Sequence, residues 1–213
     1  MAKKSVLFDL DGTLTDSGEG IINCVIPALE HFGLPVPSRE ALRVFVGPPL
    51  QDSFIQHGVP ADKAEEAVAV YRSRYIPIGM FENTPYPRIR ELLEALTAGG
   101  HKLYIATSKP EGMSREILDH FDLSKYFTMI CGASMDFSRN TKEAVIAYLL
   151  EQSGESENMV MVGDTKFDIL GAKHHGIPAI GVSWGYGKVE DMVAAGAEAI
   201  ADTPRQLLEL LEA

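Results

Sequence analysis

The sequence predicts an α/β protein in which a doubly wound parallel sheet carries a small inserted all-helical domain. Two patterns indicate this fold. Short apolar segments alternate with segments of helical periodicity through most of the chain, which is typical of a parallel sheet. Between Thr15 and Asn83, by contrast, helical segments follow one another with no strand pattern. We therefore expect an α/β core domain of residues 1–15 and 84–213 and a helical cap domain of residues 16–83.

Composition narrows the class of partner. The 213 residues are 46% hydrophobic and 23% charged, ordinary values for a globular protein. The net charge of −11, with no basic stripe, argues against a nucleic-acid polymer as partner. Cys24 and Cys131 match no metal-binding spacing and suggest a reducing compartment. The first apolar run ends at Asp9, too early for a signal peptide, and no apolar segment approaches the ~20 residues of a membrane span. We expect a cytoplasmic protein, either a monomer or a weak homodimer.

The first predicted strand, Val6–Phe8, ends in a pair of carboxylates. Asp9 and Asp11 are two residues apart, so both side chains point the same way on an extended backbone. Two like charges on one side repel each other unless a cation or a shared proton compensates them. Carboxylate oxygens suit Mg²⁺, and Gly12 permits a sharp turn close to a ligand. The segment therefore favours a Mg²⁺ site over a simple strand end.

The inserted segment is interrupted by proline and glycine. Gly33 ends its first helix, and Gly47-Pro48-Pro49 interrupts the chain again. The helices predicted in it are Gly18–Phe32, Ser38–Val46, Leu50–His57 and Ala61–Tyr75.

The remaining elements alternate as strand and helix. The further strands are Leu103–Ala106, Thr128–Cys131, Met159–Val162 and Ala179–Val182, and the helices are Arg88–Ala98, Glu111–His120, Lys142–Gln152, Asp168–His174 and Pro204–Glu212. In such sheets a ligand binds beyond the carboxyl ends of the strands, so the polar residues there are the candidate site.

Three of these positions carry suitable residues. Thr107 and Ser108 follow a strand and offer hydroxyl and backbone N–H donors to a phosphate oxygen, although such residues also start helices. Lys142 opens a helix, where the dipole disfavours a cation, and a nearby phosphate would explain the placement. Asp164 and Asp168 follow another strand and are either helix caps or further acidic residues of the cation site.

Asp9-Leu10-Asp11-Gly12-Thr13-Leu14 resembles the first motif, DxDGT, of the haloacid dehalogenase-like superfamily of phosphatases. The segments at Thr107-Ser108, at Lys142 and at Gly163–Asp168 resemble the other three motifs in order. The resemblance implies that Asp9 is the nucleophile, which becomes an aspartyl phosphate, and that Asp11 is the general acid/base. It further implies two sets of ligands. The phosphate would be bound by Lys142 and by Thr107, with Ser108 as the second choice for the hydroxyl. The Mg²⁺ would be bound by Asp9, Asp11, Asp164 and Asp168.

A substrate-contacting segment is also implied. Gly47-Pro48-Pro49-Leu50 resembles a cap loop that contacts substrate in phosphoglycolate phosphatase-like and 5′-nucleotidase-like relatives. Phosphoglycolate would need a cationic anchor for its carboxylate, and a nucleoside monophosphate would need an aromatic platform. Arginines and aromatic residues of the cap fit these two needs: Arg43, Arg72 and Arg74 for the first, and Phe45, Phe54 and Tyr75 for the second. The sequence leaves both substrates open.

The resulting hypothesis is a Mg²⁺-dependent phosphatase that acts on a small phosphate monoester, most similar to the phosphoglycolate phosphatase-like and 5′-nucleotidase-like branch. A β-phosphoglucomutase-like mutase shares every catalytic residue and remains an alternative. Haloacid dehalogenases lack the second Asp of the motif, so the presence of Asp11 argues against that activity. A non-enzymatic receiver switch also pairs acidic residues with Thr and Lys, but it has no cap insert and no Asp-x-Asp-Gly-Thr turn.

Overall fold

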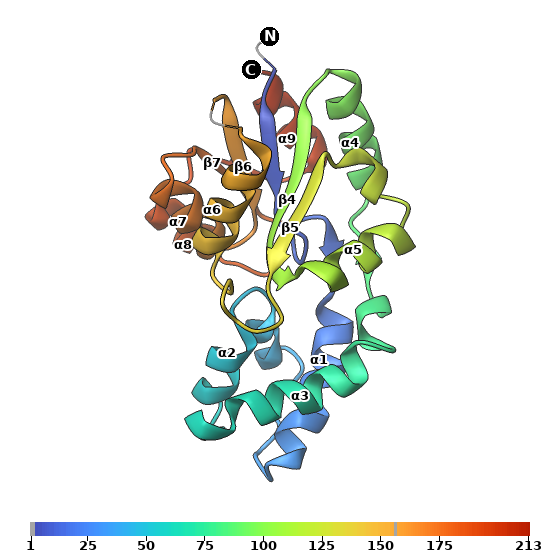
Figure 1. The fold of residues 1–213 in the computed structure, drawn as a ribbon, viewed down its shortest axis with the longest axis vertical. Helices are drawn as coiled ribbons and strands as arrows, with labels where there is room; N and C mark the ends of the chain where they lie inside the picture. The colour runs from blue at the N-terminus through green and yellow to red at the C-terminus, as the bar shows by residue number, and fades with distance from the viewer. Residues whose placement is uncertain (1–2, 156) are drawn as a thin grey trace.

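The computed structural model of the protein describes residues 3–155 and 157–213. Within them, six parallel strands form the central sheet in the order β5-β4-β1-β6-β7-β8 (Figure 1). Their bounds are β1 Ser5–Phe8, β4 Lys102–Pro110, β5 Met129–Ala133, β6 Met159–Gly163, β7 Ala179–Val182 and β8 Ala199–Ala201. This architecture confirms the predicted fold class.

Helices cover both faces of the sheet, and the side chains of β1 alternate between the two cores that these helices form with it. Val6 and Phe8 pack into one core with α4 (Ile89–Ala98), α5 (Glu111–His120) and α9 (Pro204–Glu212). Leu7 points to the opposite core, formed with α6, α7 and α8. Those three helices span Lys142–Ser153, Lys166–His174 and Val189–Ala195. The central strand is therefore fully buried, and the residue after it emerges at the carboxyl edge of the sheet.

The segment predicted as a cap forms a separate layer beyond that edge (Figure 1). It contains α1 (Gly18–His31), α2 (Leu50–Gln56) and α3 (Ala64–Tyr75), with single 3₁₀ turns at Ala41–Phe45, Ala61–Lys63 and Gly79–Phe81. Two short antiparallel strands, β2 (Thr15–Asp16) and β3 (Thr84–Pro85), connect it to the core. The start of β1 and the end of α9 lie at the opposite end of the molecule (Figure 1). The boundaries of the cap as a domain stay a prediction.

Some elements differ from expectation. The helix predicted over Ser38–Val46 is only the 3₁₀ turn Ala41–Phe45, because its buried side chains, Leu42, Phe45 and Val46, all lie in its second half while residues 38–41 are exposed. The two-residue strand β2 lies at the edge of a segment where we expected no strand. The strand β8 and the helix α8 were not predicted, since three and seven residues are too few for a periodic pattern. A further 3₁₀ turn, Ser124–Tyr126, precedes β5.

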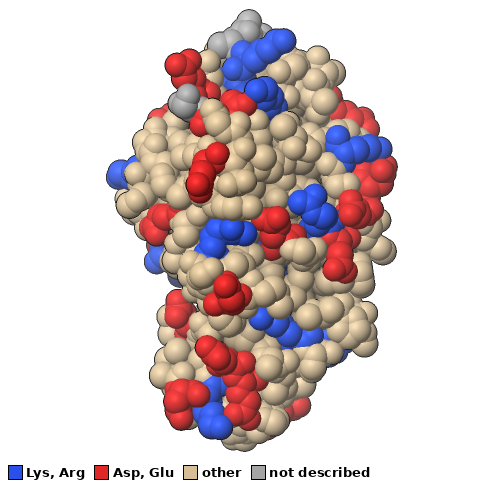
Figure 2. Space-filling view, viewed as in Figure 1, with Lys and Arg blue, Asp and Glu red and all other residues tan. Residues whose placement is uncertain are grey.

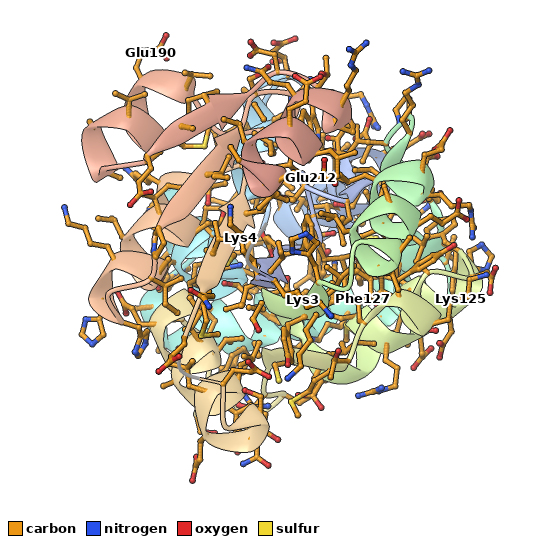
Figure 3. All side chains as sticks on the ribbon, turned by 90° about the horizontal axis from the view of Figure 1, so that it is seen from above. Lys3, Lys4, Lys125, Phe127, Glu190 and Glu212 are labelled. Carbon is orange, nitrogen blue, oxygen red and sulfur yellow. The ribbon has the colours of Figure 1, made fainter. Side chains whose placement is uncertain are left out.

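The surface carries charges of both signs. On the face shown in Figure 2, acidic and basic side chains are interspersed over core and cap alike. Seen from above in Figure 3, Lys3 and Lys4 lie near the start of β1, at the end of the sheet away from the cap layer. None of the helices in the described part of the chain is both long and apolar enough to span a membrane.

Candidate active site

The site begins where β1 ends. The Asp9 amide still donates to the carbonyl of Val162 in β6 (3.0 Å), so the sheet positions the backbone of this residue. The chain then turns tightly, because the Leu10 carbonyl accepts from the amides of Leu14 (2.9 Å) and Thr15 (3.1 Å). Gly12, at φ +82°, makes this turn possible. The Asp9 side chain is thereby held, nearly buried, at the carboxyl edge.

Three buried carboxylates meet at this edge. Asp9, Asp164 and Asp168 each offer an oxygen within 4.8 Å of the others. Asp164 accepts from the Thr13 hydroxyl (3.2 Å) and from the Tyr186 amide (2.8 Å). The backbone also closes tightly around Asp164, since a Cβ atom at Gly12 would collide with its carboxylate. An all-oxygen, negatively charged and rigid donor set of this kind fits Mg²⁺.

The pKa values of the clustered carboxyl groups reflect their burial and their mutual repulsion. Burial raises the pKa of Asp164 well above its usual range, and repulsion from Asp168 and Asp9 raises it further. Burial also raises the pKa of Asp168, although the ammonium of Lys142 opposes the shift. The cluster therefore needs a compensating positive charge, either protons or a divalent cation.

Lys142 supplies one compensating charge. Its Nζ lies 2.9 Å from Asp9 Oδ1 and 2.7 Å from Asp168 Oδ1, and it donates to the Ala106 carbonyl at 2.8 Å. Burial alone would lower the pKa of Lys142, but attraction to Asp168 and Asp9 raises it above the usual value. These contacts explain why a lysine opens helix α6 against the helix dipole: it is buried and paired.

Asp168 connects the cluster to helix α7. Its Oδ2 accepts from the Thr165 amide (3.0 Å) and the Thr165 hydroxyl (2.8 Å), which forms a capping box. Its Oδ1 faces Lys142. Asp168 thus caps helix α7 through one carboxylate oxygen and pairs with Lys142 through the other.

Asp11 lies apart from the three-carboxylate cluster. Its Oδ2 is 2.9 Å from the Nζ of Lys109, a buried lysine that also bonds the hydroxyl of Tyr75. Burial would lower the pKa of Lys109, but attraction to Asp11 and Tyr75 raises it above its usual value. We had not predicted a role for Lys109, because nothing in its spacing distinguishes it from a surface lysine.

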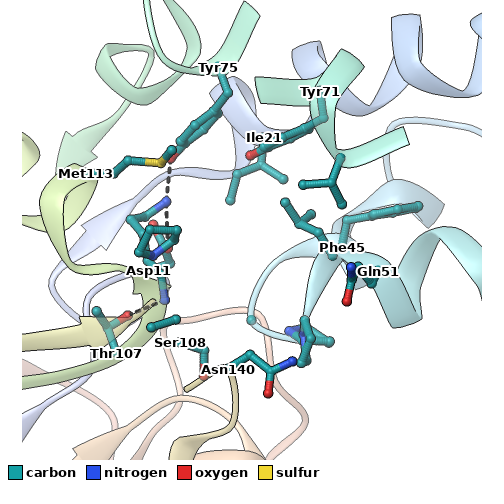
Figure 4. Close-up of a pocket in the computed structure, with 18 of the residues that line it drawn as sticks. Asp11, Ile21, Phe45, Gln51, Tyr71, Tyr75, Thr107, Ser108, Met113 and Asn140 are labelled. Atoms are coloured by element: carbon teal, nitrogen blue, oxygen red, sulfur yellow. Dashed lines mark hydrogen bonds and ion pairs between the residues drawn. The ribbon is translucent and has the colours of Figure 1, made fainter. Parts of the chain in front are cut away.

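A pocket separates the core from the cap layer (Figure 4). From the core, Asp9, Asp11, Thr107 and Ser108 line it; of the cap, the whole Gly47–Leu50 loop does. Most of the predicted site residues therefore meet at one cavity.

The three cap arginines have different surroundings. Arg72 lines the pocket, with its guanidinium 5.2 Å from the centre of the Phe137 ring. Arg43 instead lies over the ring of Tyr186, at 5.1 Å, and Arg74 pairs with Glu82 at 2.7 Å. Of the three candidate anchors, only Arg72 faces the cavity within the described part of the chain.

Aromatic side chains form part of the cap wall of the pocket. Phe45, Tyr71 and Tyr75 all line it, and the two tyrosine rings stack at 5.0 Å. Phe54 lies behind Phe45, with ring centres 5.2 Å apart, and is fully buried.

The loop Trp184–Gly187 packs against the site from the side. Trp184 Nε1 donates to the Thr13 carbonyl (3.0 Å), and the Tyr186 amide donates to Asp164. The Tyr186 hydroxyl accepts from the Gly18 amide (2.7 Å) and donates to Asp16. The loop thus braces both the DxD turn and the connection to the cap.

Comparison with known proteins is consistent with this geometry. Residues 6–182 match the family model described as haloacid dehalogenase-like hydrolase. The chain is 44% identical over 192 residues to a protein of Pseudomonas aeruginosa named 5′-nucleotidase, covering 89% of this chain and 87% of that protein. It is 30% identical over 218 residues to a Vibrio parahaemolyticus protein named phosphoglycolate phosphatase, covering 98% and 96% of the two chains.

Another relative carries a different name. The chain is 43% identical over 186 residues to the tyrosine-protein kinase PtkA of Mycobacterium tuberculosis; the match covers 87% of this chain but 64% of that protein. Among solved structures, a predicted phosphatase from Clostridium acetobutylicum superimposes with a TM-score of 0.96, at 41% identity and full coverage of both chains.

Proposed function

This chain belongs to the haloacid dehalogenase-like hydrolase family, and we propose on that premise that it is a Mg²⁺-dependent phosphatase that cleaves small phosphate monoesters through an aspartyl phosphate on Asp9. The observation that carries the proposal is the surroundings of Asp9. This carboxylate lines the pocket, belongs to the three-carboxylate cluster and pairs with Lys142. A nucleophilic carboxylate and compensating positive charge are what phosphoryl transfer requires.

Asp9, Asp11, Thr107 and the neighbouring Lys142 have distinct roles in this reaction. Asp9 attacks phosphorus as the bond to the leaving oxygen breaks, and Asp11 gives that oxygen a proton. Asp11 then takes a proton from the water that hydrolyses the acyl phosphate. Lys142 and Thr107 stabilise charge on the phosphoryl oxygens. Mg²⁺ held by Asp9, Asp164 and Asp168 would supply further screening of that charge.

The pocket favours a nucleoside 5′-monophosphate over phosphoglycolate as substrate. Its cap wall offers the aromatic faces of Phe45, Tyr71 and Tyr75, on which a nucleobase can stack. The similarity to a protein named 5′-nucleotidase supports this preference. Phosphoglycolate would have Arg72 as its one cap cation among the described lining residues.

A substrate panel tests the preference. We expect nucleoside 5′-monophosphates to give higher kcat/KM than phosphoglycolate, hexose phosphates or pyrophosphate. Arg72→Met should then change kcat/KM for the nucleotides by less than about threefold, because no carboxylate needs the guanidinium. A panel led by phosphoglycolate, with at least a tenfold loss in Arg72→Met, would reverse the assignment. Isomerisation of β-glucose 1-phosphate would favour the mutase.

Metal dependence is tested by thermal unfolding. The folded-state pKa values of Asp164 and Asp168 are raised, so both groups favour the folded state at low pH and oppose it as pH rises through those values. The metal-free melting temperature should therefore fall as the pH rises above about 4, the usual pKa of an aspartate. Saturating Mg²⁺ should offset this loss, raising the melting temperature by about 5–10 °C at pH 8 and by less at pH 5.

Matched variants sharpen the test. Asp164→Ala should abolish most of the Mg²⁺-induced shift and raise the Mg²⁺ concentration needed for activity. Asp62→Ala removes an exposed carboxylate of the cap and should leave both unchanged. An unaltered Mg²⁺ titration in Asp164→Ala, or full activity after exhaustive chelation, would contradict the metal assignment.

A further inference from the structure

Lys109 is a buried cation between the core and the cap layer. Its side chain is 6% exposed, and its Nζ lies 2.9 Å from Asp11 Oδ2. The same ammonium bonds the hydroxyl of Tyr75 and lies 4.6 Å from the centre of that ring. Figure 4 shows the two contacts as a chain that runs from Tyr75 to Asp11. None of the roles proposed above uses this lysine.

The backbone of β4 is irregular where it presents Lys109. The pairing of β4 with β5 shifts register between Thr107 and Pro110, the mark of a bulge, and bulges re-aim side chains next to active sites. The Lys109 amide donates to the Thr107 hydroxyl at 3.2 Å. The opposing strand accommodates the bulge with Gly132, where a Cβ atom would lie 2.5 Å from the Lys109 carbonyl oxygen. The local backbone thus places both Thr107 and Lys109 on the wall of the pocket.

The two oxygens of Asp11 have different surroundings. Oδ2 faces the ammonium, whereas Oδ1 is buried and has no hydrogen-bond partner among the described residues. We propose that Lys109 is a positioning residue for Asp11: it holds Oδ2, leaves Oδ1 to exchange the proton, and balances the charge that Asp11 gains when the proton leaves. This inference rests on the proposed phosphatase function, because it needs Asp11 as the acid.

The proton balance is explicit. As the bond between phosphorus and the leaving oxygen breaks, its electron pair goes to that oxygen, which takes the proton from Asp11. The carboxylate that remains is negative, and a fixed ammonium stabilises it more in the transition state than in the ground state. In the second half-reaction the same carboxylate takes a proton from the attacking water.

Tyr75 ties this arrangement to the cap layer. It is the last residue of α3, and its ring stacks on Tyr71 on the pocket wall. Its hydroxyl reaches Lys109 only when α3 lies over the carboxyl edge, as it does in this structure. The acid is therefore fully positioned only when the cap covers the substrate, which limits proton donation in an open, wet site.

The test compares two leaving groups. An alkoxide, as in a nucleoside 5′-monophosphate, leaves poorly without a proton, whereas p-nitrophenolate leaves readily without one. In Lys109→Met we expect kcat for the nucleotide to fall about 100-fold, with KM changed less than about threefold. For p-nitrophenyl phosphate, kcat should fall less than about fivefold. Lys109→Arg should recover at least about tenfold of the nucleotide rate, since it restores the charge.

Two further variants keep the test decisive. Tyr75→Phe retains the stacked ring and should show the same dependence on the leaving group, with a smaller loss of kcat. It provides the test if Lys109→Met folds poorly. Lys102 lies on the same strand, and its side chain is 60% exposed. The variant Lys102→Met should therefore hydrolyse both esters at the wild-type rate. Equal losses for both esters, a loss confined to KM, or no loss would overturn the inference. Failure of the proposed function would look different: the wild type itself would hydrolyse neither ester.

Discussion

Replacing Asp9 by asparagine is expected to lower the rate of hydrolysis by at least about 10⁴-fold, while the protein stays folded. The amide has almost the volume of the carboxylate, so packing at the end of β1 is preserved. It is not a nucleophile toward phosphorus, and it offers a weaker ligand to a cation. The measurement is turnover of p-nitrophenyl phosphate by purified protein, with circular dichroism and the melting temperature as controls of folding.

Asp11→Asn serves as the matched comparison for this variant. It keeps the nucleophile and removes the proton donor, so turnover should also fall, but a phosphorylated form of the enzyme can accumulate on Asp9. Acid quenching followed by intact-protein mass spectrometry would reveal the added phosphoryl group in Asp11→Asn and not in Asp9→Asn. Near-normal hydrolysis by folded Asp9→Asn would remove this residue from the mechanism.

Lys142→Met is expected to lower both stability and activity. Truncating one partner of a buried ion pair leaves uncompensated charge and typically costs about 3–5 kcal/mol of unfolding free energy. Here Asp9 and Asp168 would both lose their cation. Turnover should fall by at least about 100-fold, because the phosphoryl oxygens lose a fixed positive charge. Urea unfolding and p-nitrophenyl phosphate hydrolysis measure the two effects.

The pH dependence of this loss of unfolding free energy shows whether Lys142 stabilises the charged carboxylates. Without Lys142, the raised pKa of Asp168 should rise further, so the variant loses most stability at high pH and recovers part of it at low pH, where the carboxyl is protonated. Lys173→Met removes an exposed lysine on α7 and should leave the stability unchanged at both low and high pH. A deficit in Lys142→Met that is small, or independent of pH, would show that the lysine does not compensate the cluster.

The sheet and much of the candidate site are predictable because two simple rules apply. Runs such as Val6–Phe8 and Met159–Val162 are apolar throughout, since parallel strands are buried on both faces. Parallel strands also end at one edge, so the polar residues that follow them converge. Asp9, Thr107 and Asp164 accordingly come together from three strands that lie far apart in the chain.

Contacts that depend on packing between elements were not predictable. The role of Lys109 requires a bulge in β4 and a tyrosine from another layer, and neither leaves a pattern in the sequence. The three cap arginines look alike in sequence. Arg74 is held by Glu82 and Arg43 by Tyr186, while Arg72 reaches the pocket. These outcomes depend on which neighbour lies within reach once the helices are docked.

The central place of β1 has a consequence for the order in which the protein folds. Val6 pairs with Leu103 on one side and with Val160 on the other, so both neighbours of the first strand are synthesised long after it. Contacts of such long sequence separation form slowly, because a large loop must close before they are gained. The intervening helices can collapse locally while β1 waits unpaired. Asp9 therefore acquires its full surroundings only after β6 leaves the ribosome. A nascent chain that stops short of β6 can pair β1 with β4, but it contains neither Asp164 nor Asp168.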